Sequence, residues 1–200
     1  MRKALTDSPT KQRLLDTAQR CVLENGFSAT SVDEICKDAK LTKGSFFHYF
    51  KSKDALGAEL LRRYCENGKQ MFKGGCCSQE KDPLKRVYGF LDFMIVLARK
   101  KDGKGCLLGS MAQELSDTHP EIRAICAAGF AGMAEILKKD LAEAKSKHAP
   151  KASFSPREVA DHFVAVLEGS MLLARVRKDA GFKENGLKHF KAYVQSLFMK

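Results

Sequence analysis

The amino-acid sequence predicts an all-α protein, and three observations support this fold class. Apolar residues recur at a spacing of three and four along most of the chain, which is typical of amphipathic helices. Serine, threonine and proline stand repeatedly where such segments begin, and glycine where they end. No run of alternating Val, Ile, Thr or Tyr is long enough to predict a strand.

The composition describes a basic, globular chain of 200 residues, with 44% hydrophobic and 30% charged residues. The net charge of +11 suits a polyanionic partner. Residues 1–65 carry 12 basic and 8 acidic residues, and residues 66–200 carry 23 and 16, so neither part concentrates the charge. The seven cysteines are odd in number and show no Cys-x-x-Cys pair, which is typical of a reducing compartment. With no signal peptide and no apolar run of membrane-spanning length, we expect a cytoplasmic protein without metal or cofactor.

The first 65 residues predict a compact headpiece of three helices followed by a fourth. Ser8-Pro9 should begin the first helix, as cap and first residue, and Asn25-Gly26 should end it. Ser31 and Glu34 have the spacing of a capping box for a second helix over residues 31–39. Thr42 should cap a third helix over residues 43–50. Ser52 should cap the fourth, which runs toward residues 74–75.

The third helix carries an unusual surface. Phe46 and Phe50 lie four residues apart and should face the core. The other face offers hydrogen-bond donors and rings where Glu and Lys are usual, which suits an electronegative partner. A short helix, a short turn and a helix that fits the major groove form a helix-turn-helix that reads double-stranded DNA. The alternative is an ordinary surface helix that happens to be aromatic.

This region resembles the tetracycline-repressor (TetR) family of bacterial regulators. The resemblance covers about residues 10 to 60 and lies in Asn25-Gly26-Phe27, Thr30-Ser31-Val32, Ile35, Lys43-Gly44-Ser45-Phe46-Phe47-His48-Tyr49-Phe50, Ser52-Lys53 and Leu56. Two residues depart from the family pattern: Phe47 stands where tyrosine is common, and Lys40 where glycine is common. The resemblance implies a homodimeric DNA-binding transcription regulator, a repressor released from a pseudo-palindromic operator by an effector.

We expect the DNA contacts to come from the third helix and its borders. Lys43 and Ser45 should lie nearest the base edges, and His48, Tyr49 and Lys53 near phosphates. The full set is Ser31, Thr42, Lys43, Gly44, Ser45, Phe47, His48, Tyr49 and Lys53.

Residues 66–200 predict a larger helical domain for ligand binding and dimerisation, so the expected domains are 1–65 and 66–200. Helices are expected over residues 82–100, 106–115, 120–145 and 156–178, the last opened by Ser155-Pro156, and from 183 onward. Residues that could line a ligand cavity, each more often plain core, are Tyr88, Met94, Cys106, Met111, Phe130, Met133, Phe163 and Met171. The resemblance implies that the last two helices pair with those of a second subunit, through Val159, Phe163, Val166, Gly169, Ser170, Phe190 and Val194.

Cys106 is the cysteine most open to a functional interpretation. It follows the break at residues 103–105 and begins a helix, whose N-terminus lowers the pKa of a thiol. Some members of the TetR family sense electrophiles or oxidants through a cysteine of the ligand domain. The alternative, a small buried apolar residue, is the more common role. Cys76 and Cys77 form a second candidate pair.

No catalytic motif is present, so we expect no enzyme activity. The competing hypotheses are a helical ligand-binding protein whose headpiece no longer binds DNA, and an enzyme that uses the C-terminal helices. A mobility shift with duplex DNA distinguishes the regulator from the ligand-binding protein.

Overall fold

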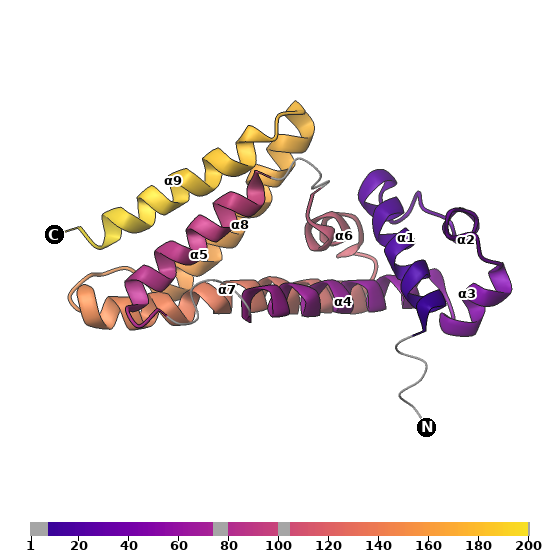
Figure 1. Ribbon diagram of the computed structural model, residues 1–200, viewed down its shortest axis with the longest axis horizontal. Coiled ribbons are helices and arrows are strands. Elements are labelled where there is room, and N and C mark those ends of the chain that lie inside the picture. Colours follow the sequence, from indigo (N-terminus) through magenta and orange to yellow (C-terminus); the bar gives the residue numbers. More distant parts are fainter. Residues whose placement is uncertain (1–7, 74–79, 100–104, 200) are drawn as a thin grey trace, which may run out of the picture. The chain divides into compact units, whose positions relative to one another are not determined.

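The computed structural model describes residues 8–73, 80–99 and 105–199. Within these ranges the chain forms nine α-helices and no strand, which confirms the all-α prediction. The helices (Figure 1) are α1 (Pro9–Asn25), α2 (Val32–Ala39), α3 (Lys43–Tyr49), α4 (Lys53–Lys73), α5 (Pro83–Ala98), α6 (Leu107–Leu115), α7 (Pro120–His148), α8 (Pro156–Arg177) and α9 (Gly181–Leu197). Among these described residues, no helix is both long and apolar enough to cross a lipid bilayer.

The predicted helix starts depend on caps, and four of the five are confirmed. Ser31, Thr42, Ser52 and Ser155 each accept a hydrogen bond from the backbone amide three residues ahead. Such caps satisfy amides that have no partner within the helix, and each contributes about 1 kcal/mol. Ser8 differs, since its side chain makes no capping hydrogen bond. Its hydroxyl instead lies 2.8 Å from the Tyr49 hydroxyl of α3.

The chain divides into two compact units. Unit 1 comprises Met1–Glu66 with Cys106–Ala127, and unit 2 comprises Asn67–Gly105 with Ala128–Lys200. The division after Glu66 lies beside the expected boundary between residues 65 and 66. Residues 106–127, expected in the second domain, pack instead with the N-terminal helices, because α6 buries Leu107, Met111 and Leu115 there.

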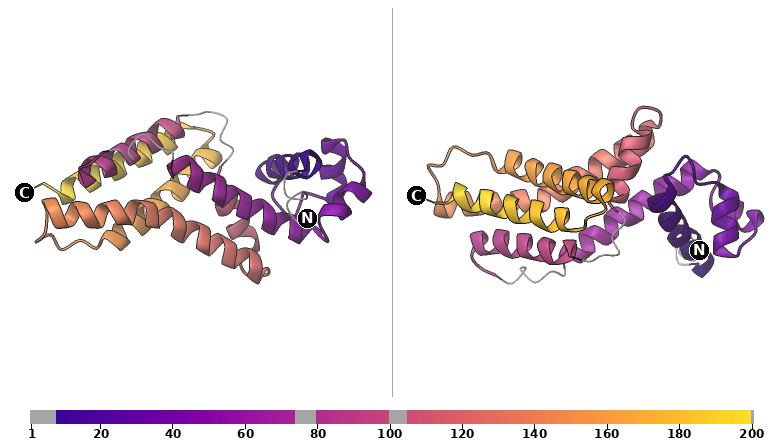
Figure 2. Two further views of the ribbon diagram at one scale, coloured as in Figure 1. Left: turned by 60° about the horizontal axis from the view of Figure 1, so that its bottom comes forward. Right: turned by 90° about the horizontal axis from the view of Figure 1, so that it is seen from above.

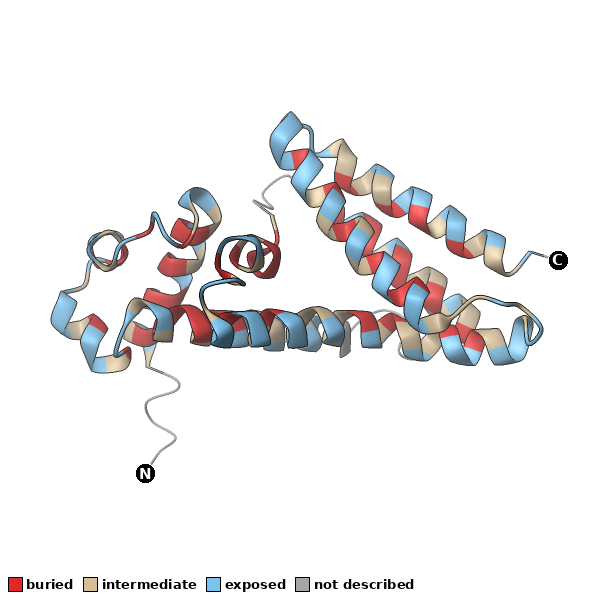
Figure 3. Cartoon of the chain, turned by 180° about the vertical axis from the view of Figure 1, so that it is seen from behind, coloured by how far each residue is buried: buried red, intermediate tan, exposed pale blue. Residues whose placement is uncertain are grey.

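The core of unit 1 includes the buried face of α3. Phe46 and Phe50 are 0% and 2% exposed, and their ring centroids lie 5.6 Å apart. Fully burying such a side chain contributes about 1.5–3 kcal/mol. The buried residues of α1, among them Leu14, Ala18 and Cys21, recur at a spacing of three and four, and Figure 3 colours buried residues red and exposed residues pale blue.

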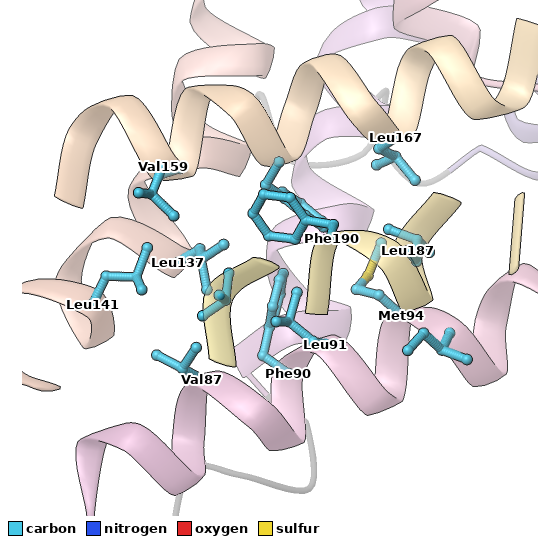
Figure 4. Packing of buried hydrophobic residues seen from close by; sticks show 14 of the residues in the cluster. Val87, Phe90, Leu91, Met94, Leu137, Leu141, Val159, Leu167, Leu187 and Phe190 are labelled. Carbon is cyan, nitrogen blue, oxygen red and sulfur yellow. The ribbon is translucent and has the colours of Figure 1, made fainter. Parts of the chain in front are cut away.

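The core of unit 2 is built from α5, α7, α8 and α9 (Figure 4). Phe163 of α8 lies at its centre, with ring centroids 5.4 Å from Phe90 and 5.6 Å from Phe190. Helix α9 contacts both α5 and α8, and Figure 2 shows these three helices alongside one another. Pairs such as Lys191 with Asp92, at 2.6 Å, join α9 to α5 at the margin of this core.

Most of the residues predicted for a dimer interface have little exposed surface in the chain. Five of the seven are buried within unit 2, because the apolar stripes of α8 and α9 face α5, α7 and each other: Val159, Phe163, Ser170, Phe190 and Val194. Val166 is half-buried and Gly169 is exposed. Ser170 does allow a close helix approach, but the neighbour is Gly186 of the same chain. A Cβ atom at Gly186 would lie 2.0 Å from the Ser170 Oγ.

Candidate nucleic-acid interface

The turn between α2 and α3 keeps the shape that glycine usually provides. Lys40 ends α2 in the left-handed region, at φ 53° and ψ 47°. Its amide hydrogen-bonds to the carbonyls of Cys36 and Lys37, and the Leu41 amide bonds to the Cys36 carbonyl at 2.9 Å. A residue with a Cβ costs about 1–2 kcal/mol in this conformation. The departure from the family pattern at Lys40 therefore leaves the turn intact at a cost in stability.

Helix α3 has one anchored face and one exposed face. Phe46 is fully buried, whereas Thr42, Lys43, Gly44 and His48 are exposed. Phe47 is 55% exposed, with its ring edge against Phe46 at a centroid distance of 5.2 Å. Ser45 and Tyr49 are partly buried at the border between the two faces. The structure thus brings the predicted third-helix residues onto a single surface.

Two of these exposed groups already have partners within the chain. The Lys43 ammonium lies 2.7 Å from the Asp33 carboxylate of α2. The hydrogen bond to Asp33, strengthened by the charge of that carboxylate, raises the pKa of Lys43. Both side chains are more than 60% exposed, so this pair is weak and Lys43 can exchange it for another partner. The His48 ring stands edge-on to Tyr49 at a centroid distance of 4.7 Å.

Lys53 differs from the expected phosphate contact. Its ammonium donates to the carbonyls of Phe27 at 3.1 Å, Ser28 at 3.3 Å and Thr30 at 3.1 Å. It also lies over the Phe27 ring, 4.7 Å from the centroid. An ammonium has three N–H donors, and these three carbonyls use all of them. Lys53 therefore fixes the loop between α1 and α2, hereafter the α1–α2 loop (residues 26–31).

Glu114 of α6 is a residue that the sequence analysis missed. Its carboxylate accepts from the Phe27 amide at 2.8 Å and from the Ser28 amide at 2.6 Å. Burial raises the pKa of the Glu114 carboxyl, but the hydrogen bonds from Ser28 and Phe27 and the charge of Lys53 outweigh burial and lower it. No local pattern could reveal this contact, because the partners lie 87 and 86 residues apart.

The predicted ligand-binding residues are divided between the two units. Met94 and Phe163 are buried in the core of unit 2, and Tyr88, Met133 and Met171 pack against that core. Phe130 is half-buried on α7. Met111 and Cys106 belong to unit 1. The eight residues therefore belong to two different units.

Cys106 lies at the start of α6 and is 6% exposed, so it is less accessible than expected. The Tyr64 hydroxyl donates to its Sγ at 3.9 Å. Cys76, Cys77 and residues 103–104 lie outside the described residues. Among the residues that the structure describes, no group of three or more His, Cys, Asp or Glu could hold a metal ion.

Known proteins resemble this chain along most of its length. Residues 14–60 match the family described as "Bacterial regulatory proteins, tetR family", and residues 83–190 match "Tetracyclin repressor-like, C-terminal domain". The HTH-type transcriptional repressor NemR of Escherichia coli (strain K12) is 27% identical over 94% of this chain and 96% of its own. The HTH-type transcriptional repressor DhaR of Mycobacterium sp. (strain GP1) is 24% identical over 86% of this chain and 85% of its own.

Solved structures agree with the sequence matches. The crystal structure of reduced E. coli NemR has a TM-score of 0.79 at 27% identity, covering 92% of this chain and 96% of that one. The regulatory protein TetR from Rhodobacter sphaeroides has a TM-score of 0.80 at 26% identity, covering 96% and 100%. Because the C-terminal match alone spans more than half of the residues, the chain belongs to the TetR family of bacterial regulatory proteins.

Proposed function

We propose that this protein is a transcriptional repressor that reads double-stranded DNA with α3. The observation that carries the proposal is the exposed face of α3, which presents Lys43, Phe47 and His48 while Phe46 anchors the helix from behind. A helix held in this way fits the major groove with its N-terminal residues at the base edges. The relatives NemR and DhaR are named repressors, which supports repression as the outcome.

The exposed residues suit different parts of a DNA duplex. Lys43 donates to guanine edges, and the Phe47 ring suits a thymine methyl group. A Cβ atom at Gly44 would meet only the Thr42 hydroxyl, at 3.6 Å, so no contact within the chain requires glycine there. Glycine at this position permits close approach of a DNA strand. Ser45 lies nearest the base edges with Lys43. Thr42, His48 and Tyr49 supply donors for phosphates along the borders of α3, and Ser31 does so at the start of α2.

We propose that the protein acts as a homodimer and that the dimer surface is the exposed stripe of α8. This stripe consists of Gly169, Leu172, Leu173 and Val176, in which Leu172 is 48% and Val176 is 70% exposed. The residues recur at helical spacing on the side of α8 away from its buried stripe. Two copies would place two α3 helices on a pseudo-palindromic operator, whose half-sites lie one turn of the DNA helix apart or a multiple of it. A regulator of this kind acts in the cytoplasm, where bacterial DNA is located.

We propose that a small molecule or an electrophile releases the repressor from DNA. A small molecule would bind beside Tyr88, Met133 and Met171, which pack at the margin of the unit 2 core. An electrophile would react with Cys106. Mapping of limiting N-ethylmaleimide by mass spectrometry tests the second route, with DNA release by wild type and Cys106→Ser compared. Cys126 is the internal control, because burial raises the pKa of its thiol to about 11.

The experiment that tests the proposed function is selection of duplexes by the purified wild-type protein from a random-sequence DNA library. We expect enrichment of a motif with two-fold symmetry. Binding that is salt-dependent but enriches no sequence would contradict the proposal. That outcome would favour the alternative, a helical ligand-binding protein or enzyme that no longer reads DNA.

A further inference from the structure

We propose that Glu114 of α6 is a positioning residue for DNA reading, because its carboxylate fixes the α1–α2 loop and thereby the start of α2. The inference rests on the proposed function, and it assigns a role to a residue outside the DNA-reading segment. Glu114 does not lie on the exposed face of α3. It acts through the backbone that precedes the helix-turn-helix.

The carboxylate holds two consecutive backbone amides. Its two oxygens accept separately from the Phe27 and Ser28 amides, at 2.8 and 2.6 Å. Hydrogen bonds from amides to a carboxylate are stronger than those between neutral groups. The Gly26 backbone, at φ 89°, turns beside the same carboxylate, and a Cβ atom there would lie 3.3 Å from the Glu114 Oε2.

Lys53 holds the same stretch through its carbonyls. Glu114 therefore takes the amides of Phe27 and Ser28, while Lys53 of α4 takes their oxygens. The Phe27 ring is 2% exposed and lies against Gly57 of α4. A Cβ atom at Gly57 would lie 2.7 Å from that ring and 3.3 Å from the Met111 methyl of α6. Groups of α4 and α6 thus determine where the α1–α2 loop lies.

The α1–α2 loop leads directly into the helix-turn-helix formed by α2 and α3. The Thr30 hydroxyl donates to the Gly26 carbonyl at 2.7 Å, and the Thr30 carbonyl is the third acceptor for Lys53. The next residue, Ser31, caps α2 and is itself a proposed phosphate contact. A displacement of the loop therefore moves the N-terminus of α2, and α3 follows after a short turn. Loss of the Glu114 contacts should reduce the fraction of molecules in which α3 is correctly placed to bind DNA.

Glutamine cannot replace this carboxylate fully, and this makes Glu114→Gln an informative variant. An ionised carboxylate accepts with both oxygens, whereas a glutamine amide has one acceptor oxygen and one NH₂ group. In the variant, one of the two loop amides would face a donor. Glu121→Gln is a matched control. Glu121 lies in the same segment of unit 1, Cys106–Ala127, and pairs with Arg62 of α4 at 2.7 Å. It is not among the loop's hydrogen-bond partners described above.

The experiment measures the affinity of each variant for the duplex that wild type selects, by fluorescence anisotropy at 15 °C. Circular dichroism verifies that every variant is folded at that temperature. We expect Glu114→Gln to bind about 5- to 150-fold more weakly, the usual range for coupled sites. The slope of affinity against salt should be unchanged, because no phosphate contact is lost. Amide exchange at Phe27 and Ser28 should be faster than in wild type. Glu121→Gln should bind as wild type does.

A Glu114→Gln variant that is folded and binds the duplex with wild-type affinity overturns the inference while leaving the proposed function standing. Equal weakening by Glu121→Gln also overturns it, because the effect would then be general to this segment. If wild type selects no sequence, the proposed function and this inference fail together. Glu114→Asp provides a second variant if Glu114→Gln does not fold. Aspartate keeps the charge but is one methylene shorter, and we expect weaker binding with the same salt slope.

Discussion

Gly186→Ala should destabilise the protein, and the cause is a single neighbouring side chain. The new Cβ atom would lie 2.0 Å from the Ser170 Oγ, 3.1 Å from the Ser170 Cβ and 3.7 Å from a Val166 methyl. The hydroxyl can rotate away, but the short distance between the two Cβ atoms remains. Overpacking of this kind costs about 1–3 kcal/mol. Alanine recovers about 1 kcal/mol of helix propensity, so the expected net loss is at most about 2 kcal/mol.

In a Ser170→Gly background the same substitution should have the opposite sign. Both short contacts are then gone, and the remaining distance of 3.7 Å to Val166 is an ordinary van der Waals contact. Gly186→Ala should there stabilise the protein by up to about 1 kcal/mol through helix propensity. Urea unfolding measures the free energy of unfolding of wild type, the two single variants and the double variant, all at the same protein concentration. These four values complete the double-mutant cycle. Equal effects of Gly186→Ala in both backgrounds would refute the close crossing of α8 and α9.

Three further predictions concern the headpiece, the dimer and the pH dependence. Gly57→Ala should lower the free energy of unfolding by about 1–3 kcal/mol, since its Cβ would lie 2.7 Å from the Phe27 ring; calorimetry measures it, and unchanged stability would contradict the packing of Phe27. Val176→Glu should dissociate the dimer without unfolding the chain, because Val176 is 70% exposed, and a variant that sediments as an intact dimer would place the interface elsewhere. Lys147, and with it His148 and the Lys85 amide, lowers the pKa of Asp82 against a smaller opposing effect of burial. A depressed carboxyl pKa stabilises the fold above its unfolded value of about 4, and this stability is lost as the pH falls further. Asp82→Asn should therefore flatten the acid limb of the stability profile, and an unchanged limb in acid titration would contradict this role.

Much of the fold follows from local signals in the sequence. Ser31, Thr42 and Ser52 act within their own first helical turn, so the start of each helix is visible in a few residues. The spacing of four between Phe46 and Phe50 likewise predicts that both lie on the buried face of the helix, and both are buried. The surface composition of α3 identifies the candidate DNA-reading face, because its residue types are unusual on a solvent-exposed helix.

Other features depend on contacts between distant residues and could not be predicted in this way. Lys53 looks available for a phosphate in the sequence, but the carbonyls it binds lie 23 to 26 residues earlier. Glu114 contacts a loop 87 residues away. An apolar stripe on α8 predicts that this face is buried, but it does not tell whether the same chain or a second subunit covers it. Phe163 packs against Phe90 and Phe190 of the same chain. Five of the seven residues predicted for the dimer stripe are therefore buried within their own chain.

The central claim is that the exposed face of α3 reads DNA sequence. The most direct measurement repeats the duplex selection with Lys43→Ala and compares the enriched motif with that of wild type. Lys151→Ala, which removes the same charge from an exposed position after α7, is the control. We expect Lys43→Ala to relax the preference at one base pair of each half-site and to cost about 1–3 kcal/mol of binding, while Lys151→Ala selects the wild-type motif. An unchanged motif and affinity for Lys43→Ala would contradict the claim.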